Sequence, residues 1–266
     1  MKAALLIPLL VISSPVHAQD VPVDLELVLM VDVSRSMSPT ELEIQRTGYV
    51  EALRSDEVHE AILSGYQGRI AVTYVEWAGS QQVIVPWRLL ETREDLIALA
   101  DDLSVTFNPS LRRTSISEAL HFGAALFQDN GYMGDRTVID ISGDGPNNQG
   151  RYVNEARDAV VAQGVTINGL PLMTRDGMGA DWSIDHLDLY YETCVIGGIG
   201  AFVLPVYDWE DFPEAVKRKM VMEIFIGEGE TPENPERLVP IQYRDSTDCQ
   251  IGEKMWEARR GIWAEP

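Results

Sequence analysis

Residues 25–38 read LELVLMVDVSRSMS, a largely apolar run that ends in Asp32 and continues with serines at every second position. The apolar part has the length and composition of a buried β-strand. A hydrophobic core has no use for the carboxylate of Asp32 or the hydroxyls of Ser34 and Ser36. In sheets that alternate with helices, ligands bind just beyond the carboxyl ends of the strands. The stretch therefore predicts a buried first strand followed by a functional turn.

The rest of the chain alternates short apolar runs with amphipathic stretches, which is typical of a parallel sheet covered by helices on both faces. We expect six strands, at residues 25–32, 69–77, 81–87, 136–142, 165–172 and 201–206. We expect six helices, at residues 39–55, 92–102, 115–129, 150–163, 182–193 and 210–226. The sequence WAGSQQ indicates a hairpin turn, so residues 81–87 form an antiparallel edge strand that tolerates Pro86. The predicted fold is α/β, doubly wound, with a six-stranded and mostly parallel sheet.

Two of the expected helices begin with capping signals. Ser38 precedes Pro39, and proline suits the first position of a helix. Ser115 and Glu118 have the spacing of a capping box. The helix that Ser115 would open places four apolar side chains on one face: Ile116, Leu120, Ala124 and Phe127.

The N-terminus reads MKAALLIPLLVISSPVHA, with a lysine, an apolar run, a Ser-Ser-Pro break and small residues before the last alanine. This pattern predicts an export signal over residues 1–18 that is cleaved after Ala18. No other run approaches the roughly 20 apolar residues that a membrane span needs, so we expect no membrane-spanning segment. The expected location is periplasmic or secreted.

The formal net charge of the chain is −21. Such a surface repels nucleic acid and anionic lipid headgroups, and it attracts cations and basic partners. We therefore expect no nucleic-acid partner. The acid excess also serves as an ordinary solubilising coat, which needs no specific partner.

The chain has two cysteines, Cys194 and Cys249. In a compartment that oxidises thiols, a disulfide between them is the natural pairing. From Gly227 the sequence becomes rich in proline and acids, and this last segment is too short to bury a core of its own. We expect a signal peptide over 1–18, a domain over 19–229 and an extension over 230–266 that the disulfide ties to the domain.

Oxygen-bearing side chains follow three predicted elements at one edge of the sheet. Asp32, Ser34 and Ser36 follow the first strand, Thr114 precedes the mid-chain helix, and Asp144 follows the fourth strand. Carboxylates and hydroxyls without histidine or thiol are hard donors, which select magnesium, manganese or calcium over zinc or copper. The set predicts a site for a divalent cation.

The order of these residues also resembles a known family. A D-x-S-x-S turn after an apolar strand, a threonine that opens a mid-domain helix and an Asp-Gly after the fourth strand resemble the metal-ion-dependent adhesion site (MIDAS) of von Willebrand factor type A domains. The resemblance covers roughly residues 24–226. The runs VIDISGDGPNN and CVIGGIGAFV further resemble an uncharacterised group of exported bacterial proteins that carry this domain.

The resemblance implies a role for each candidate ligand. Ser34, Ser36 and Thr114 would contact the metal directly, whereas Asp32 and Asp144 would act mainly through bound water. One coordination position would stay open for an Asp or Glu side chain of a partner protein. The implied function is magnesium-dependent binding of a partner, with calcium or manganese as alternatives.

This sequence departs from the family pattern beside the last aspartate. The family usually has a hydroxyl residue directly before the Asp-Gly, whereas here Gly143 intervenes and Ser142 lies one place earlier. Ser142 and Asp140 are therefore candidates for contacting the ligands rather than the ion. An aspartate within an apolar strand is also often a buried carboxylate with its own partner, and Asp140 fits that description.

Other interpretations of the same residues remain open. A helix-loop-helix calcium loop would need a glycine where Met37 stands. The hydroxyls could also serve only as helix caps. The main alternative function is a metal-dependent hydrolase acting on phosphoesters. The chain has no G-x-S-x-G motif. His121 and His186 lie in expected helices and His59 lies in helix-like sequence after the first of them, all away from the motif turns.

Overall fold

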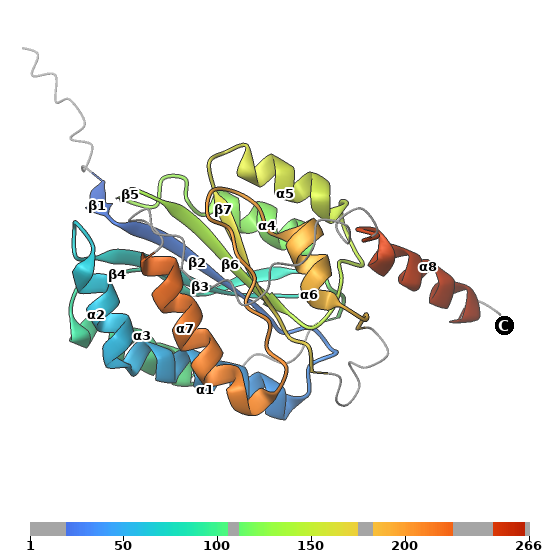
Figure 1. Ribbon diagram of the computed structural model, residues 1–266, viewed down its shortest axis with the longest axis horizontal. Coiled ribbons are helices and arrows are strands. Elements are labelled where there is room, and N and C mark those ends of the chain that lie inside the picture. Colours follow the sequence, from blue (N-terminus) through green and yellow to red (C-terminus); the bar gives the residue numbers. More distant parts are fainter. Residues whose placement is uncertain (1–19, 106–111, 175–182, 226–246, 264–266) are drawn as a thin grey trace, which may run out of the picture.

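The computed structural model describes residues 20–105, 112–174, 183–225 and 247–263. A central sheet carries helices on both faces (Figure 1), and its strand order is β4-β3-β2-β6-β7. Its members are β2 (Leu25–Asp32), β3 (Ile70–Trp77), β4 (Gln81–Leu90), β6 (Thr137–Gly143) and β7 (Thr166–Pro171). The doubly wound α/β fold predicted from the sequence is confirmed.

The strands pair as the apolar pattern predicted. β2 pairs in parallel with both β3 and β6, and β6 pairs in parallel with β7. β4 is the antiparallel edge, joined to β3 by the expected tight turn over 78–80. Every residue of β2 and β3 is buried, because helices cover both faces of the sheet. A separate two-stranded parallel sheet joins β1 (Val21–Val23) to β5 (Tyr132–Gly134), and the sequence pattern did not predict it.

The sixth expected strand, residues 201–206, is not a strand, so the sheet has five strands rather than six. The segment still runs beside β7, where Gly169 N–H donates to Phe202 O at 3.0 Å and Met173 N–H donates to Val206 O at 2.7 Å. Pro171 stands at the position whose N–H would donate between these two bonds, and proline has no N–H. The ladder is thereby reduced to isolated bridges.

Two hydrophobic cores lie on opposite faces of the sheet. The first is formed with α1 (Pro39–Arg54), α2 (Asp56–Ser64), α3 (Arg93–Val105) and α7 (Phe212–Phe225). The second is formed with α4 (Ile116–Ala125), α5 (Val153–Val161), α6 (Leu187–Tyr190) and the π-helix Tyr191–Val195 that continues α6. The expected helix over 39–55 matches α1, and the sequence pattern did not predict α2, which Ser55 caps.

The helix starts differ in how well their caps were predicted. Ser38 and Glu41 form a complete capping box at the start of α1, with Pro39 at its first position. α4 begins at Ile116, and Ile116, Leu120 and Ala124 of its predicted apolar face are buried. The helix ends at Ala125, before the expected residue 129, so Phe127 lies beyond it and is only partly buried. The predicted capping box of Ser115 and Glu118 is wrong, because the side chain of Ser115 does not cap the helix.

The C-terminal segment is tied to the domain by the predicted disulfide between Cys194 and Cys249. Beyond it, α8 (Ile251–Trp263) projects away from the body (Figure 1). The proline-rich stretch that we expected to be an extended arm lies outside the described residues, as does the expected export signal. Within the described ranges, no helix is both long and apolar enough to cross a bilayer.

Candidate metal centre

A chain of hydrogen bonds links the ends of two neighbouring strands. After β2, the Oδ1 atom of Asp32 accepts from the backbone N–H of Ser34 at 2.7 Å. The hydroxyls of Ser34 and Ser36 lie 2.8 Å apart, and the Ser36 hydroxyl donates to Oδ1 of Asp144, after β6, at 2.8 Å. The structure thus brings together four of the five candidate ligands by side-chain contact.

The two carboxylates are buried close to each other. Asp32 is fully buried and Asp144 is 7% exposed. Burial raises the pKa of Asp32 well above its usual value, and the nearby charge of Asp144 raises it further. Burial also raises the pKa of Asp144 to about 6, against the lowering effect of the Ser36 hydrogen bond. Within the described part of the chain, the Oδ2 atom of Asp32 has no hydrogen-bond partner, which is costly for a buried oxygen.

Thr114 reaches the same edge of the sheet through its backbone. Its N–H donates to Oδ1 of Asn148 at 3.0 Å, and its carbonyl accepts from the N–H of Asn148 at 2.8 Å. The next residue, Ser115, donates its N–H to the carbonyl of Ala78, in the β3–β4 turn. Thr114 is buried between the β3–β4 turn and the loop that contains Asp144. These contacts place the fifth candidate beside the loop that carries Asp144.

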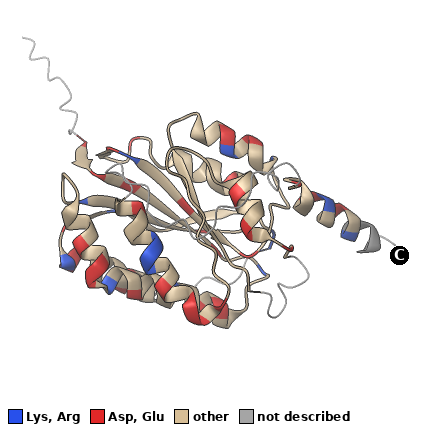
Figure 2. Cartoon of the chain, viewed as in Figure 1, with Lys and Arg blue, Asp and Glu red and all other residues tan. Residues whose placement is uncertain are grey.

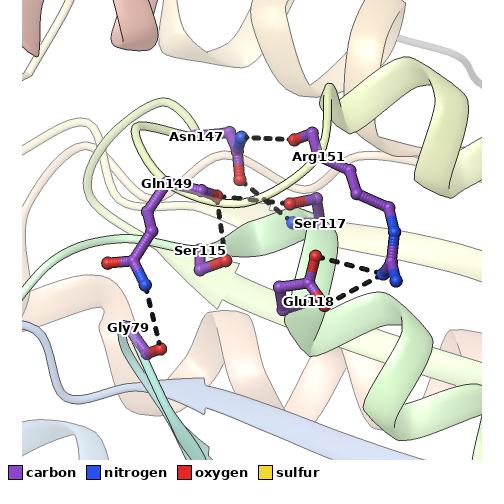
Figure 3. A network of polar contacts seen from close by, with 7 residues as sticks. All are labelled: Gly79, Ser115, Ser117, Glu118, Asn147, Gln149 and Arg151. Carbon is purple, nitrogen blue, oxygen red and sulfur yellow. Dashed lines mark hydrogen bonds and ion pairs between the residues drawn. The ribbon is translucent and has the colours of Figure 1, made fainter.

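The loop after Asp144 also holds the start of α4 (Figure 3). The Oδ1 atom of Asn147 accepts from the N–H of Ser117 at 3.0 Å, so Asn147 caps the helix from a distant part of the chain. The Ser115 hydroxyl is free for another role and donates to the carbonyl of Gln149 at 2.9 Å. Glu118 pairs instead with Arg151, at 2.9 Å. Neither Asn147 nor Gln149 carries a sequence signal beyond following a strand end.

The glycine that departs from the family pattern has a structural reason. A Cβ atom at Gly143 would lie 2.7 Å from the hydroxyl of Tyr191 and 2.9 Å from Oδ2 of Asp32. It would also lie 3.1 Å from the Trp77 ring, so a larger residue does not fit here. The hydroxyl of Tyr191 and Nε1 of Trp77 are buried and, like Oδ2 of Asp32, have no hydrogen-bond partner among the described residues. The hydroxyl of Tyr191 therefore occupies the space that a side chain at position 143 would need.

Asp140 and Ser142 lie further inside the fold. Asp140 forms a buried ion pair with Lys219 of α7, at 2.5 Å. The Ser142 hydroxyl donates to the carbonyl of Met30 at 3.4 Å. Asp140 thus has its partner in α7, and Ser142 has its partner in β2.

The donor set decides which ion the residues fit. In the described ranges, no three His, Cys, Asp or Glu side chains come together to hold a metal. An ion at this edge would depend on two carboxylates and on hydroxyl oxygens. These are hard donors, and the deficit of positive charge around Asp32 and Asp144 suits a divalent cation. The residues present fit the metal that the resemblance implies.

The fold is shared with several solved structures. Proximal thread matrix protein 1 from the mussel byssus is 13% identical, with a TM-score of 0.57 over 77% of this chain and 49% of that chain. Another structure of that protein is described as having a zinc-occupied MIDAS motif, with 14% identity, 77% and 49% coverage and a TM-score of 0.53. The pilus adhesin SpaC from Lactobacillus rhamnosus GG is 14% identical, with a TM-score of 0.54 over 78% of this chain and 31% of that chain. A von Willebrand factor type A structure from Catenulispora acidiphila is 13% identical, with a TM-score of 0.54 over 76% and 43%.

These likenesses establish the fold of a von Willebrand factor type A domain. The chain spans less than half of the length of each of these proteins. A search of the curated proteins finds no match to the sequence. The family described as "Protein of unknown function (DUF1194)" matches residues 22–227. The chain therefore belongs to the DUF1194 family.

Proposed function

We propose that this protein is an exported module that binds a divalent cation and uses it to recognise an acidic side chain of a partner protein. The observation that carries the proposal is the chain of hydrogen bonds from Asp32 through Ser34 and Ser36 to Asp144. At the Asp32 end of this chain, the buried Oδ2 atom has no hydrogen-bond partner among the described residues. A cation would neutralise both carboxylates and satisfy that oxygen, which the protein's own groups do not do.

Each residue of the set has a separate task in this proposal. The hydroxyls of Ser34, Ser36 and Thr114 would hold the ion directly, and the two aspartates would hold its bound waters. Because few charged groups would touch the ion, it would keep a strong attraction for an incoming carboxylate. The zinc-occupied MIDAS described for the mussel protein and the adhesin role in the name of SpaC support this function.

The first test is cation binding by the chain without residues 1–18. After treatment with a chelator, magnesium, calcium or manganese should raise the melting temperature as the concentration of the ion rises. Asp32→Ala and Thr114→Ala should abolish this rise and leave a folded protein. Glu60→Ala, which removes an exposed acid of α2, is the matched control and should respond like the wild type. A rise that persists in the Asp32 and Thr114 variants would contradict the site.

The second test concerns the partner. Immobilised protein should retain a partner in magnesium, release it in chelator, and fail to retain it when Asp144 is replaced by alanine. An enzyme of the phosphoesterase kind would instead show metal-dependent turnover that Asp32→Ala abolishes. That result would replace binding by hydrolysis as the function of the same site.

A further inference from the structure

The C-terminal helix α8 lies beyond the family match, which ends at residue 227, yet it contacts the loops of the candidate metal centre. The disulfide fixes Cys249, two residues before α8, to the buried Cys194 at the π-helix. Cys194 follows Tyr191, whose hydroxyl faces Asp32, within the same π-helix. The helix is thus anchored covalently beside the site.

The first contact joins α8 to the loop that carries Asp144. Oε1 of Glu253 accepts from Nδ2 of Asn147 at 2.7 Å. Gly252 lies so close to the carbonyl of Asn147 that a Cβ atom there would overlap it. Asn147 also holds the start of α4 through Ser117, so Glu253 closes a set of hydrogen bonds that positions this loop.

The second contact joins α8 to the loop that carries Thr114. The guanidinium of Arg113 lies over the ring of Trp256, 3.3 Å from its centre. Arg113 has a φ of 77°, in the left-handed region that residues other than glycine seldom adopt. Arg113, directly before Thr114, is therefore held in a strained conformation with its guanidinium against the Trp256 ring of α8.

We propose that α8 is a strut that sets the positions of the Thr114 and Asp144 loops and thereby the affinity of the centre for its cation. This inference rests on the proposed function. Its two contacts fall within the first six residues of the helix, one on each loop, and each meets a residue next to or near a candidate ligand. Lys254 and Glu257, on the same helix, are exposed, so the helix is not packed against the body on all sides.

The test compares cation affinity with stability of the empty protein. In the chain without residues 1–18, the double variant Glu253→Ala with Trp256→Ala should bind magnesium at least tenfold more weakly by calorimetry. Lys254→Ala is the control on the same helix, because its exposed side chain pairs with Asp248 of the same segment, and its Kd should equal that of the wild type. An unchanged Kd with a lower melting temperature in the double variant would overturn the inference and leave α8 a stabilising element alone.

A second measurement needs no variant. If α8 favours the loop positions that bind the cation, then the cation must stabilise the contacts of α8 by the same free energy. Hydrogen exchange of the wild type should slow on addition of magnesium at residues 251–256 as well as at 113–114 and 147–148. If exchange slows only in the two loops and not at residues 251–256, the proposed role of α8 is refuted. Failure of the wild type to bind magnesium, calcium and manganese would instead refute the proposed function.

Discussion

At the scale of single residues, the placement of Asp32 lowers the stability of the folded protein. Its Oδ1 atom holds the turn through Ser34, while its Oδ2 atom is buried beside the Tyr191 hydroxyl without a hydrogen bond. Such an arrangement persists where function requires it, because an unpaired buried charge lowers the free energy of unfolding.

We therefore predict opposite effects of Asp32→Asn on stability and on binding. The amide keeps the oxygen that accepts from Ser34 and removes the charge, so without metal the variant should be more stable by about 1–3 kcal/mol. Its response to magnesium should be lost. Urea denaturation in chelator and in magnesium measures both quantities. A variant that is less stable than the wild type in chelator would show that Asp32 is a structural residue.

Gly143 supports a second prediction at this scale. A methyl group there would meet the Tyr191 hydroxyl at 2.7 Å, and overpacking of this kind costs about 1–3 kcal/mol. Gly143→Ala should lower the free energy of unfolding by that amount, and Tyr191→Phe should restore part of the loss by removing the hydroxyl. A double-mutant cycle in urea gives the coupling. Independent, additive losses would show that the two groups do not compete for this space.

Single residues also show how far the sequence could predict the site. Asp32, Ser34 and Ser36 were recognisable because they follow one strand at regular spacing, and Asp144 because it follows another. Tyr191 and Asn147 reach the site from elements whose placement depends on the whole fold, so no local pattern identified them.

At the scale of elements, the start of α4 depends on a distant residue. Asn147 accepts from the Ser117 N–H, donates to the Arg151 carbonyl at 3.0 Å, and donates to Glu253. Asn147→Ala should therefore lower the free energy of unfolding by about 2–3 kcal/mol, which is more than an ordinary lost cap. Urea denaturation checks this value.

The control for that prediction is Glu60→Ala in α2, because the side chain of Glu60 is exposed. This variant should stay within about 0.5 kcal/mol of the wild type. Equal losses in the two variants would mean that Asn147 does not hold α4.

Strands and helices were predictable from the sequence where local patterns of apolar and turn residues determine them. The buried strands and the β3–β4 hairpin followed from apolar runs and turn residues. The strand expected at residues 201–206 failed because the missing donor belongs to Pro171 of the neighbouring β7, and not to the segment itself. The Ser115 cap failed for a similar reason, since Asn147 from another loop supplies the cap. Both errors come from contacts made across the fold, which local spacing does not contain.

At the scale of the whole molecule, acidic residues are spread over helices on both faces of the sheet (Figure 2). A second group of acids is buried between the sheet and α7. Nζ of Lys219 lies 2.5 Å from both Asp140 and Glu223, and Asn168 donates to Glu223 at 3.1 Å. One lysine thus faces two carboxylates in the first core. The cluster joins α7 to β6, the strand that directly precedes Asp144.

Because two buried carboxylates share one lysine, the free energy of unfolding of the whole fold depends on pH. Burial, together with the charge of Asp140, raises the pKa of Glu223 from 4.5 to about 7. Between these values the folded protein binds more protons than the unfolded chain, so the contribution of Glu223 to the free energy of unfolding falls as pH rises. Below about pH 4.5 this penalty is absent, and above pH 7 it is complete.

We predict that Glu223→Gln removes this penalty. Measured in chelator, so that the metal site stays empty, the variant should gain stability relative to the wild type between pH 5 and pH 8. The gain should approach about 3 kcal/mol. Glu60→Gln changes an exposed acid of α2 and should track the wild type at every pH. A difference between Glu223→Gln and wild type that is constant with pH would mean that Lys219 keeps Glu223 ionised throughout, and that the acids of this core balance without a shared proton.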